Sequence, residues 1–298
     1  MRLSIAPMLE LTDRHFRYFA RLLTKRTLLY TEMVTTGAIL HNKPEKFLQY
    51  NEVEHPVALQ LAGSSPKDLA ECAKIGEDFG YDEINLNCGC PSERVQSGSF
   101  GACLMRESEL VAECVAAMQS AVKVPVSVKT RIGIDNDDSW EFFLDFVEKT
   151  GCKYIIVHAR KAWLKGLSPK ENRTVPPLNY NIVFKLKKTH PDWKIILNGG
   201  VKNLEDAKNI LQNIDGVMIG RAACETPWIL ANADSEIFGE NPETKTREEV
   251  LEKFLLYARS QIEKGVPPSF LRKPLMGLFH GMPGAKKYRE AISILSFH

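Results

Sequence analysis

Several features that mark common protein classes are missing from this sequence. No apolar run approaches the roughly 18 residues that a membrane span requires, so we expect no contact with a membrane. The N-terminal stretch MRLSIAPMLELTDRHF lacks the long apolar segment of a secretory signal. The seven cysteines are an odd number with no CxxC pair, which predicts reduced thiols in the cytoplasm and no disulfide framework. We also expect no metal site.

The sequence has little net charge and no GxGxxG fingerprint of a dinucleotide-binding domain. Its net charge of +2 is, however, unevenly distributed. Residues 244–298 hold ten Lys and Arg against five Asp and Glu, a local charge of +5, which leaves −3 for residues 1–243. Residues 160–173, RKAWLKGLSPKENR, hold five Lys and Arg and one Glu. Each stretch is either a solvated face or a surface for an anionic partner.

What the sequence does contain is a series of short apolar, β-rich runs separated by helical patterns. The eight runs are residues 3–7, 28–33, 56–63, 83–89, 124–133, 153–159, 194–200 and 216–222. The clearest helix follows Ser65, which can cap it, with Pro66 at the first helical position and an apolar stripe that starts at Leu69. Residues 108–122 and 203–213 have similar patterns. Eight strands that alternate with helices are typical of the α/β fold called the (β/α)8 or TIM barrel, with a doubly wound open sheet as the alternative.

The pattern changes after Gly239. Residues 246–265 have the apolar spacing of a long amphipathic helix, and residues 267–295 continue with helical periodicity and no strand signal. We therefore predict two domains, a catalytic barrel over residues 1–240 and a small all-helical domain over residues 241–298. The polar stretch GENPETKT is the predicted linker.

Polar residues recur near the C-terminal ends of the predicted strands. Because side chains alternate along a strand, Asn85 shares the inward face with Asn87, and Ser127 and Arg131 share it with Lys129. Five strands each place a polar side chain near this end of the barrel: Gln60, Asn87, Lys129, His158 and Asn198. One buried polar group is commonly structural, but five without partners would cost about 1–3 kcal/mol each. They therefore predict a site for a polar, planar ligand at the face where barrel enzymes keep their active sites.

Two glycine-rich turns follow the last two predicted strands. The turns are LNGGV and MIGRA, and ETPWIL is predicted to open the next helix. Glycines allow backbone N–H groups to approach an anion, and a helix N-terminus favours negative charge. Arg221 adds a forked hydrogen-bond donor. The pair of turns predicts the phosphate site of a bound cofactor, which such barrels place after these two strands.

The motifs together resemble those of one enzyme family. The stretches IAPMLELTDRHFR, NLNCGCPSERVQSGSFGACLM, VKTRIG, HARKAWLKGLSPKENR, LNGGV and IGRAA are similar to tRNA-dihydrouridine synthases, most of all to the A-type subfamily, from residue 5 to about residue 289. The resemblance implies an FMN-binding (β/α)8 barrel with a C-terminal helical domain that binds tRNA. It implies an oxidoreductase that reduces the C5=C6 bond of uridine in the D-loop of tRNA, at positions 20 and 20a, with NADPH as the source of electrons.

The resemblance also implies roles for individual residues. Those expected to contact FMN or its phosphate are Pro7, Met8, Leu9, Gln60, Lys129, His158, Asn198, Gly199, Gly200, Gly220 and Arg221. Those expected to contact tRNA are Asn87, Lys170, Arg173, Lys286 and Arg289. Because no dinucleotide fingerprint is present, we expect NADPH to bind only transiently. We further expect a monomer with no obligate protein partner.

Cys90 is the candidate catalytic residue. Cys88 shares a strand face with Ile84 and Leu86, which predicts packing against helices, and Cys103 in GACLM is predicted to be a small buried side chain at the start of a helix. Cys90 instead follows the strand end, in a loop over the barrel mouth. A thiol in water has a pKa of about 8.5, so at neutral pH it can supply a proton. The resemblance implies that this position gives a proton to uridine C5, on the face opposite the flavin N5 that gives hydride to C6.

Three other functions are compatible with parts of the pattern. A flavin barrel that acts on a free pyrimidine, such as a dihydroorotate or dihydropyrimidine dehydrogenase, shares the fold and cofactor but needs neither basic segment. An aldolase-like barrel would use Lys129 as a Schiff-base nucleophile and would be colourless. A tRNA-binding protein without activity would have no use for Cys90 beside an intact cofactor site.

Overall fold

The computed structural model describes residues 2–297 and is built around a sheet of eight parallel strands. The strands are β1 (Arg2–Ile5), β2 (Leu29–Thr35), β3 (Val57–Ala62), β4 (Glu83–Cys88), β5 (Val126–Arg131), β6 (Tyr154–His158), β7 (Lys194–Asn198) and β8 (Gly216–Ile219). Their order is β1-β8-β7-β6-β5-β4-β3-β2, and a parallel bridge between Ser4 and Leu28 joins the two edges. The predicted (β/α)8 barrel is therefore confirmed, and the doubly wound open sheet is excluded.

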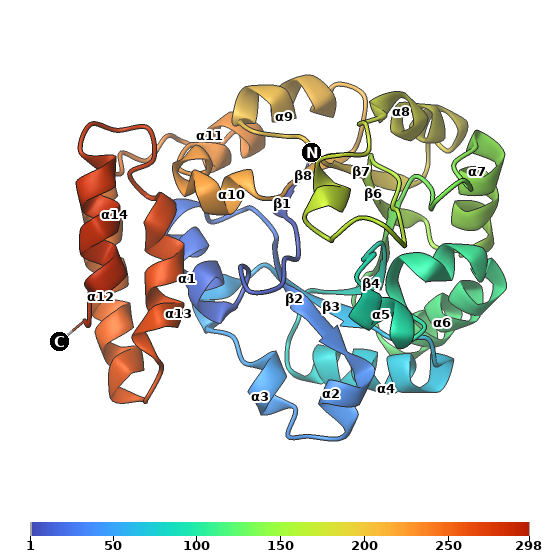
Figure 1. Ribbon diagram of the computed structural model, residues 1–298, viewed down its shortest axis with the longest axis horizontal. Coiled ribbons are helices and arrows are strands. Elements are labelled where there is room, and N and C mark those ends of the chain that lie inside the picture. The colour runs from blue at the N-terminus through green and yellow to red at the C-terminus, as the bar shows by residue number, and fades with distance from the viewer. Residues whose placement is uncertain (1, 298) are drawn as a thin grey trace.

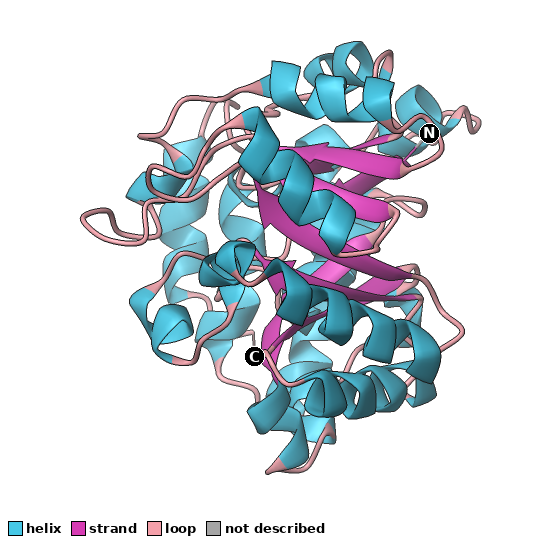
Figure 2. Cartoon of the chain, turned by 90° about the vertical axis from the view of Figure 1, so that its right-hand side faces the viewer, coloured by secondary structure: helices cyan, strands magenta, loops and turns pink. Residues whose placement is uncertain are grey.

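Helices surround the strands on the outside of the barrel (Figure 1, Figure 2). The α-helices of this part are α1 (Arg14–Leu23), α2 (Thr36–Leu40), α3 (Glu45–Leu48), α4 (Pro66–Asp78), α5 (Glu93–Ser97), α6 (Ser108–Ala121), α7 (Trp140–Lys149), α8 (Tyr180–Thr189), α9 (Leu204–Leu211), α10 (Ala222–Glu225) and α11 (Ala233–Phe238). Short 3-10 turns are η1 (Glu52–Glu54), η2 (Gly101–Arg106), η3 (Glu171–Arg173) and η4 (Pro227–Leu230). Within residues 2–297, no helix has both the length and the apolar character needed to cross a membrane.

The α4 helix forms for the reasons that its sequence suggests. The Ser65 hydroxyl accepts a hydrogen bond from the backbone N–H of Asp68, and Pro66 occupies the first turn. Its apolar stripe is buried against the barrel, where Leu69 and Cys72 have no exposed surface. The prediction for this helix is confirmed, with its end at Asp78.

Alternation along β4 separates a helix-facing side from an inward side. Ile84, Leu86 and Cys88 are fully buried. A Cβ at Gly76 of α4 would lie 2.8 Å from the Ile84 side chain, so this face packs tightly against the helix. The residues between them point into the barrel. Register then aligns the inward residues of neighbouring strands, with Asn87 opposite Lys129 on β5.

The C-terminal segment is helical, as predicted, and packs on α1. It contains α12 (Arg247–Glu263), α13 (Pro268–Arg272), the 3-10 turn η5 (Lys273–Gly277) and α14 (Ala285–Ile294), which lie together at one edge of the molecule (Figure 1). The Tyr257 ring stacks on Tyr18 at 3.7 Å between centroids, and its hydroxyl lies 2.8 Å from His15 Nδ1. Aromatic packing therefore fixes α12 against the first barrel helix. The division into two domains at residue 240 stays a prediction.

The segment after β8 differs from its prediction. The stretch ETPWIL was expected to open the next helix, but α10 already begins at Ala222, and Thr226 ends it. Pro227 then begins the 3-10 turn η4. Proline has no backbone N–H to continue the hydrogen bonds of α10, so the chain turns at this point.

Candidate active site at the barrel mouth

A cavity of about 530 Å³ opens at the C-terminal ends of the strands. All the residues predicted to form the cofactor site line it: Pro7, Met8, Leu9, Gln60, Lys129, His158, Asn198, Gly199, Gly200, Gly220 and Arg221. Asn87, Cys90 and Arg173 line it as well. The barrel thus gathers residues from both ends of the chain into one place. Their individual roles stay predictions.

Glu83 anchors a chain of hydrogen bonds inside the barrel. Its side chain is almost fully buried and accepts hydrogen bonds from the hydroxyls of Tyr30, Ser127 and Tyr154. The Ser127 and Tyr154 oxygens lie 2.6 and 2.9 Å from the carboxylate. These donors satisfy a group that would otherwise be costly to bury. Since Ser127 gives its proton to Glu83, its oxygen is left to accept a hydrogen bond from another side chain.

Three side-chain amides continue the chain from Ser127 towards the mouth. Asn85 Nδ2 donates to Ser127 Oγ at 2.8 Å, and Asn85 Oδ1 accepts from Gln60 Nε2 at 2.7 Å. Gln60 Oε1 in turn accepts from Asn87 Nδ2 at 2.8 Å. Every donor points in the direction of Glu83, so the carboxylate determines which end of each amide faces the mouth. As a result, Asn87 presents its carbonyl oxygen to the mouth.

That oxygen holds the loop that carries Cys90. Asn87 Oδ1 accepts hydrogen bonds from the backbone N–H groups of Gly89 and Cys90, at 3.1 and 3.0 Å. Arg131 holds the same loop from β5, because its Nε donates to the Gly89 carbonyl at 3.0 Å. Its Nη1 also donates to two carbonyl groups of the basic loop 160–173, at 3.0 and 2.8 Å. Two strands therefore fix the position of Cys90.

Lys129 reaches the mouth beside Asn198. Its Nζ donates to Asn198 Oδ1 at 3.1 Å, and Asn198 Nδ2 donates to the Met218 carbonyl at 2.8 Å. Burial lowers the pKa of Lys129 to about 7, and Arg131 adds to the lowering, while Cys90 acts in the opposite direction. A lysine with this pKa is only partly charged at neutral pH, and a bound anion would favour its charged form.

The mouth carries an excess of positive charge. The cationic side chains that line it are Lys129, Arg131, Arg173, Lys202 and Arg221. Glu225 is the one carboxylate among the described residues of its wall. His158 adds no charge at neutral pH, because burial and then the charge of Arg131 lower its pKa well below the ordinary value. Such a cavity favours an anionic ligand.

The loops after β7 and β8, where the phosphate site is predicted, border the cavity with Gly199, Gly200 and Gly220. Gly199 and Gly200 have φ angles of +111° and +75°, and a Cβ at Gly199 would lie 2.7 Å from the His158 ring. A Cβ at Gly220 would meet nothing within 4 Å, so its backbone borders open space. The Nε of Arg173 is buried and lacks a partner among the described residues. Close backbone approach, positive charge and an unsatisfied donor fit FMN, the cofactor that the resemblance implies.

The three cysteines near the mouth occupy different environments. Cys88 is fully buried, and burial raises its pKa well above the ordinary value. Cys103 lies in the 3-10 turn η2, not at the start of an α-helix as predicted, and its half-buried Sγ donates to the Phe100 carbonyl at 3.1 Å. Of the three, Cys90 is the one that lines the cavity, with Sγ 3.6 Å from Ser92 Oγ. Its position suits a group that reaches a ligand.

The residues predicted to contact tRNA lie in two places. Asn87 and Arg173 are in the cavity wall, and the Arg221 guanidinium donates to the Arg173 carbonyl at 3.4 Å. The other three side chains are exposed and lie outside the cavity: Lys170 just before η3, and Lys286 and Arg289 on α14. The structure therefore separates Arg173 from Lys170, although one basic stretch contains both.

The residues that support the site from inside the barrel were not predicted from the sequence. Alternation placed Asn85, Ser127 and Arg131 inside the barrel but assigned them no partners. Glu83 received no role at all, yet it alternates with Asn85 on the inward face of an apolar strand. A carboxylate at such a position was the signal that could have revealed it, because a buried carboxylate needs donors.

Comparisons with known proteins show similarity over nearly the whole chain. The family model described as dihydrouridine synthase (Dus) matches residues 4–298. The tRNA-dihydrouridine(20/20a) synthase of Vibrio parahaemolyticus is 59% identical over 296 residues, which cover 98% of this chain and 90% of that protein. The protein of the same name in Escherichia coli (strain K12) is 54% identical over 296 residues, which cover 98% of this chain and 86% of that protein. The chain therefore belongs to the dihydrouridine synthase family.

Proposed function

We propose that this protein reduces uridine to 5,6-dihydrouridine in the D-loop of tRNA, at positions 20 and 20a. Relatives named for this activity match the chain over nearly its whole length. The observation that carries the proposal is the position of Cys90, which is half-buried in the cationic mouth and held there by hydrogen bonds from its loop to Asn87 and Arg131.

FMN, once reduced by NADPH, would supply the hydride that adds to C6 of uracil. Gln60, Lys129 and His158 line the part of the cavity that would hold its ring, and the glycine turns with Arg221 would hold its phosphate. Lys129 lines the same cavity, and a cation beside the bound ring would stabilise the negative charge of its reduced form. The neutral form of His158 at neutral pH can either donate or accept a hydrogen bond there.

Cys90 completes the reduction by supplying a proton. The C4 carbonyl of uracil polarises the C5=C6 bond, so hydride at C6 leaves negative charge that C5 shares with the carbonyl. The S–H bond of Cys90 then breaks, a C5–H bond forms, and a thiolate remains. Lys129 and Arg131 line the same cavity as Cys90, so the negative charge left on sulfur faces two basic side chains. A proton from solvent then restores the thiol.

The exposed cations suit a tRNA and are not needed for a free pyrimidine. Lys170, Lys286 and Arg289 are solvent-exposed and lie outside the cavity, where they could contact phosphates. A uridine within folded RNA has to leave its stack to enter the mouth, and contacts to the surrounding backbone offset that cost. Binding should weaken as salt increases.

The purified protein and unmodified tRNA provide the test. The protein should be yellow, bleach with NADPH and release FMN on denaturation. Mass spectrometry of the tRNA after incubation with NADPH should show dihydrouridine at positions 20 and 20a. Free uracil and uridine serve as controls and should react far more slowly. A colourless protein that takes up no added FMN contradicts the proposal, and so does equal activity on the free base.

A further inference from the structure

A second cavity, of about 640 Å³, lies beside the barrel mouth. It shares Leu9, Met33 and Ser92 with the first cavity, so the two have a common wall. The remainder of its lining comes from the start of α1, β2, the segment 38–49, α5, the loop that contains Phe100, and α13. The proposed reaction uses none of the side chains that line only this second cavity.

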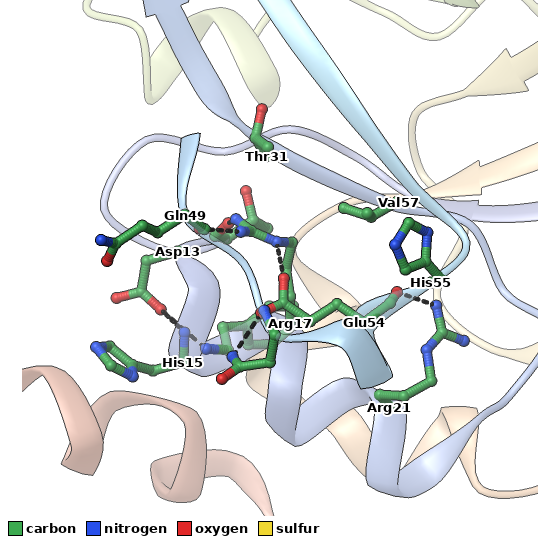
Figure 3. A network of polar contacts seen from close by, with 12 residues as sticks. Asp13, His15, Arg17, Arg21, Thr31, Gln49, Glu54, His55 and Val57 are labelled. Carbon is green, nitrogen blue, oxygen red and sulfur yellow. Dashed lines mark hydrogen bonds and ion pairs between the residues drawn. The ribbon is translucent and has the colours of Figure 1, made fainter. Parts of the chain in front are cut away.

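Several polar residues that line the second cavity, among them Asp13 and Arg17, belong to a network of hydrogen bonds and ion pairs (Figure 3). Arg17 and Glu54 form a buried ion pair with 2.6 Å between Nε and Oε2, and Arg17 also donates to the Thr12 carbonyl at 2.9 Å. Asp13 accepts a hydrogen bond from the backbone N–H of His15 at 2.9 Å and caps α1. Because these groups satisfy one another, the cavity keeps its shape without a ligand.

The walls of the second cavity are aromatic. They include Phe47 of α3, Phe270 of α13 and Phe100 in the loop after α5. The Phe270 side chain is 44% exposed. Proteins hold unpaired bases by stacking them on such rings, and this mode is independent of the base because every base has a flat face. Arg14 and Lys46 line the same cavity and can contact a nucleotide's phosphate.

The remaining polar groups favour a neutral ring over an anion. Asp13 and Glu32 are half-buried carboxyl groups in this cavity, and burial raises the pKa of each. Gln49 adds an amide. The edge of a base offers both N–H donors and carbonyl acceptors, which can pair with carboxyl and amide groups. The second cavity also has three basic side chains, Arg14, Arg17 and Lys46, but with its two carboxyl groups it is less positive than the mouth, which has five basic side chains and one carboxylate. The mouth therefore suits the phosphates of NADPH better.

We propose that this second cavity holds the base next to the uridine that is being reduced. The inference rests on the proposed function, in which two neighbouring uridines are substrates. A uridine in the mouth brings the adjacent nucleotide to the common wall formed by Leu9, Met33 and Ser92. The base on one side of that uridine, either 5′ or 3′, then occupies the second cavity. The arrangement keeps this base and the uridine in the mouth out of the RNA stack during the reaction.

The test combines protein variants with modified tRNA. Phe47→Ala and Phe270→Ala are compared with the wild type on tRNA that has one target uridine and either an intact base or an abasic nucleotide on its 5′ or 3′ side. Each variant should bind intact tRNA about tenfold more weakly, as the loss of one stacked base predicts. One abasic tRNA should weaken wild-type binding by a similar factor. Combining variant and abasic tRNA should cause no further loss, because both remove the same contact.

Phe142→Ala is the matched control, since Phe142 is another half-buried phenylalanine but lies on α7, away from both cavities. It should bind every tRNA as the wild type does. Phe270 is exposed, so its variant tests the site even if Phe47→Ala does not fold.

Additive losses in the combined experiment would overturn the proposal, as would normal tRNA affinity of both variants. Slower flavin reduction by NADPH in the absence of tRNA would also overturn it and assign the cavity to the nicotinamide donor. If the wild-type protein makes no dihydrouridine, the proposed function fails. The binding experiment would then still decide whether the second cavity holds a base.

Discussion

The side-chain oxygen of Asn87 lies 3.0 Å from the backbone nitrogen of Cys90 and accepts its hydrogen bond. The orientation of the Asn87 amide is determined by a chain of hydrogen bonds through Gln60, Asn85 and Ser127. This chain ends at the carboxylate of Glu83, at the N-terminal end of β4, and each side chain donates in its direction. A buried charge far from the mouth therefore positions the loop of the candidate acid.

Asn87→Ala should slow dihydrouridine formation about 10²-fold, because displacement of a reacting group by about 1 Å has an effect of that size. The variant should retain FMN. Single-turnover reduction of bound tRNA by pre-reduced enzyme measures the step directly. Asn87→Asp keeps an acceptor for the Cys90 N–H and should lose less. A loss confined to tRNA affinity would instead support the tRNA contact that the family resemblance implies for this residue.

Glu83→Gln should weaken both the fold and the reaction, although this residue touches no ligand. A glutamine that donates to Ser127 would reverse the amides above it, and Asn87 would then turn its NH2 group towards the Cys90 N–H. We expect a loss of about 1–3 kcal/mol in the free energy of unfolding, measured with urea, together with slower proton transfer. Ser127→Ala breaks the same chain and should reproduce the slower step. Normal kinetics in both variants would contradict this positioning role.

Cys90→Ala should keep FMN, NADPH oxidation and tRNA binding but make dihydrouridine about 10²- to 10⁴-fold more slowly, the usual contribution of a general acid. Cys88→Ala and Cys103→Ala should retain most activity, and Cys88→Ala should lower stability because that thiol is fully buried. Single-turnover assays on unmodified tRNA compare the three. Full activity of Cys90→Ala, or an equal loss in Cys103→Ala, would reject the assignment.

The strands were the part of the fold most accessible from sequence. Each of the eight apolar runs overlaps a strand of the barrel, because short buried strands are apolar and turn residues bound them, although β1 begins one residue before its run and β2 ends two residues after its run. The alternation of side chains along a strand also correctly predicted that Asn87 and Lys129 point into the barrel. Both signals are local, so one sequence is sufficient to read them.

The partners of these side chains could not be predicted, because they depend on the register between strands and on loop conformation. Gln60 reaches both Asn85 and Asn87 only because β3 pairs with β4 in one particular register. In the basic loop, Lys170 faces solvent and Arg173 the cavity, although they are three residues apart. Charge in a sequence does not show which of two such residues turns inward.

FMN binding should be linked to proton uptake by Lys129. The pKa of this group is lowered to about 7, so at pH 8 most of the protein carries a neutral lysine. An anion bound beside it favours the charged form and raises its pKa, so up to one proton per FMN should be taken up at this pH. Calorimetry in two buffers of different ionisation enthalpy measures the uptake. The same uptake in Lys129→Met would show that another group is responsible.

The lowered pKa of Lys129 also predicts a pH dependence for the stability of the FMN-free protein. Between about pH 7 and pH 10 the unfolded chain keeps the proton on Lys129 and the folded chain does not, so the unfolded state binds more protons. The contribution of this group to the free energy of unfolding therefore becomes more favourable as pH rises through that window. Urea unfolding at several pH values should show wild-type stability rising relative to Lys129→Met. A constant difference between the two proteins would contradict the lowered pKa.

Lys170→Ala and Arg173→Ala should have different effects, because Arg173 lines the cavity and Lys170 does not. Lys170 is exposed, so its loss should weaken tRNA binding and reduce the slope of affinity against salt by about one, with FMN affinity unchanged. Arg173 lines the cavity and has a buried Nε without a partner among the described residues, so loss of its side chain should weaken FMN binding. Flavin fluorescence and tRNA titrations at several salt concentrations separate the two effects. Arg289→Ala on α14 is the matched control and should behave as Lys170→Ala does. If Arg173→Ala changes only tRNA binding, Arg173 belongs to the tRNA surface that its basic stretch first suggested.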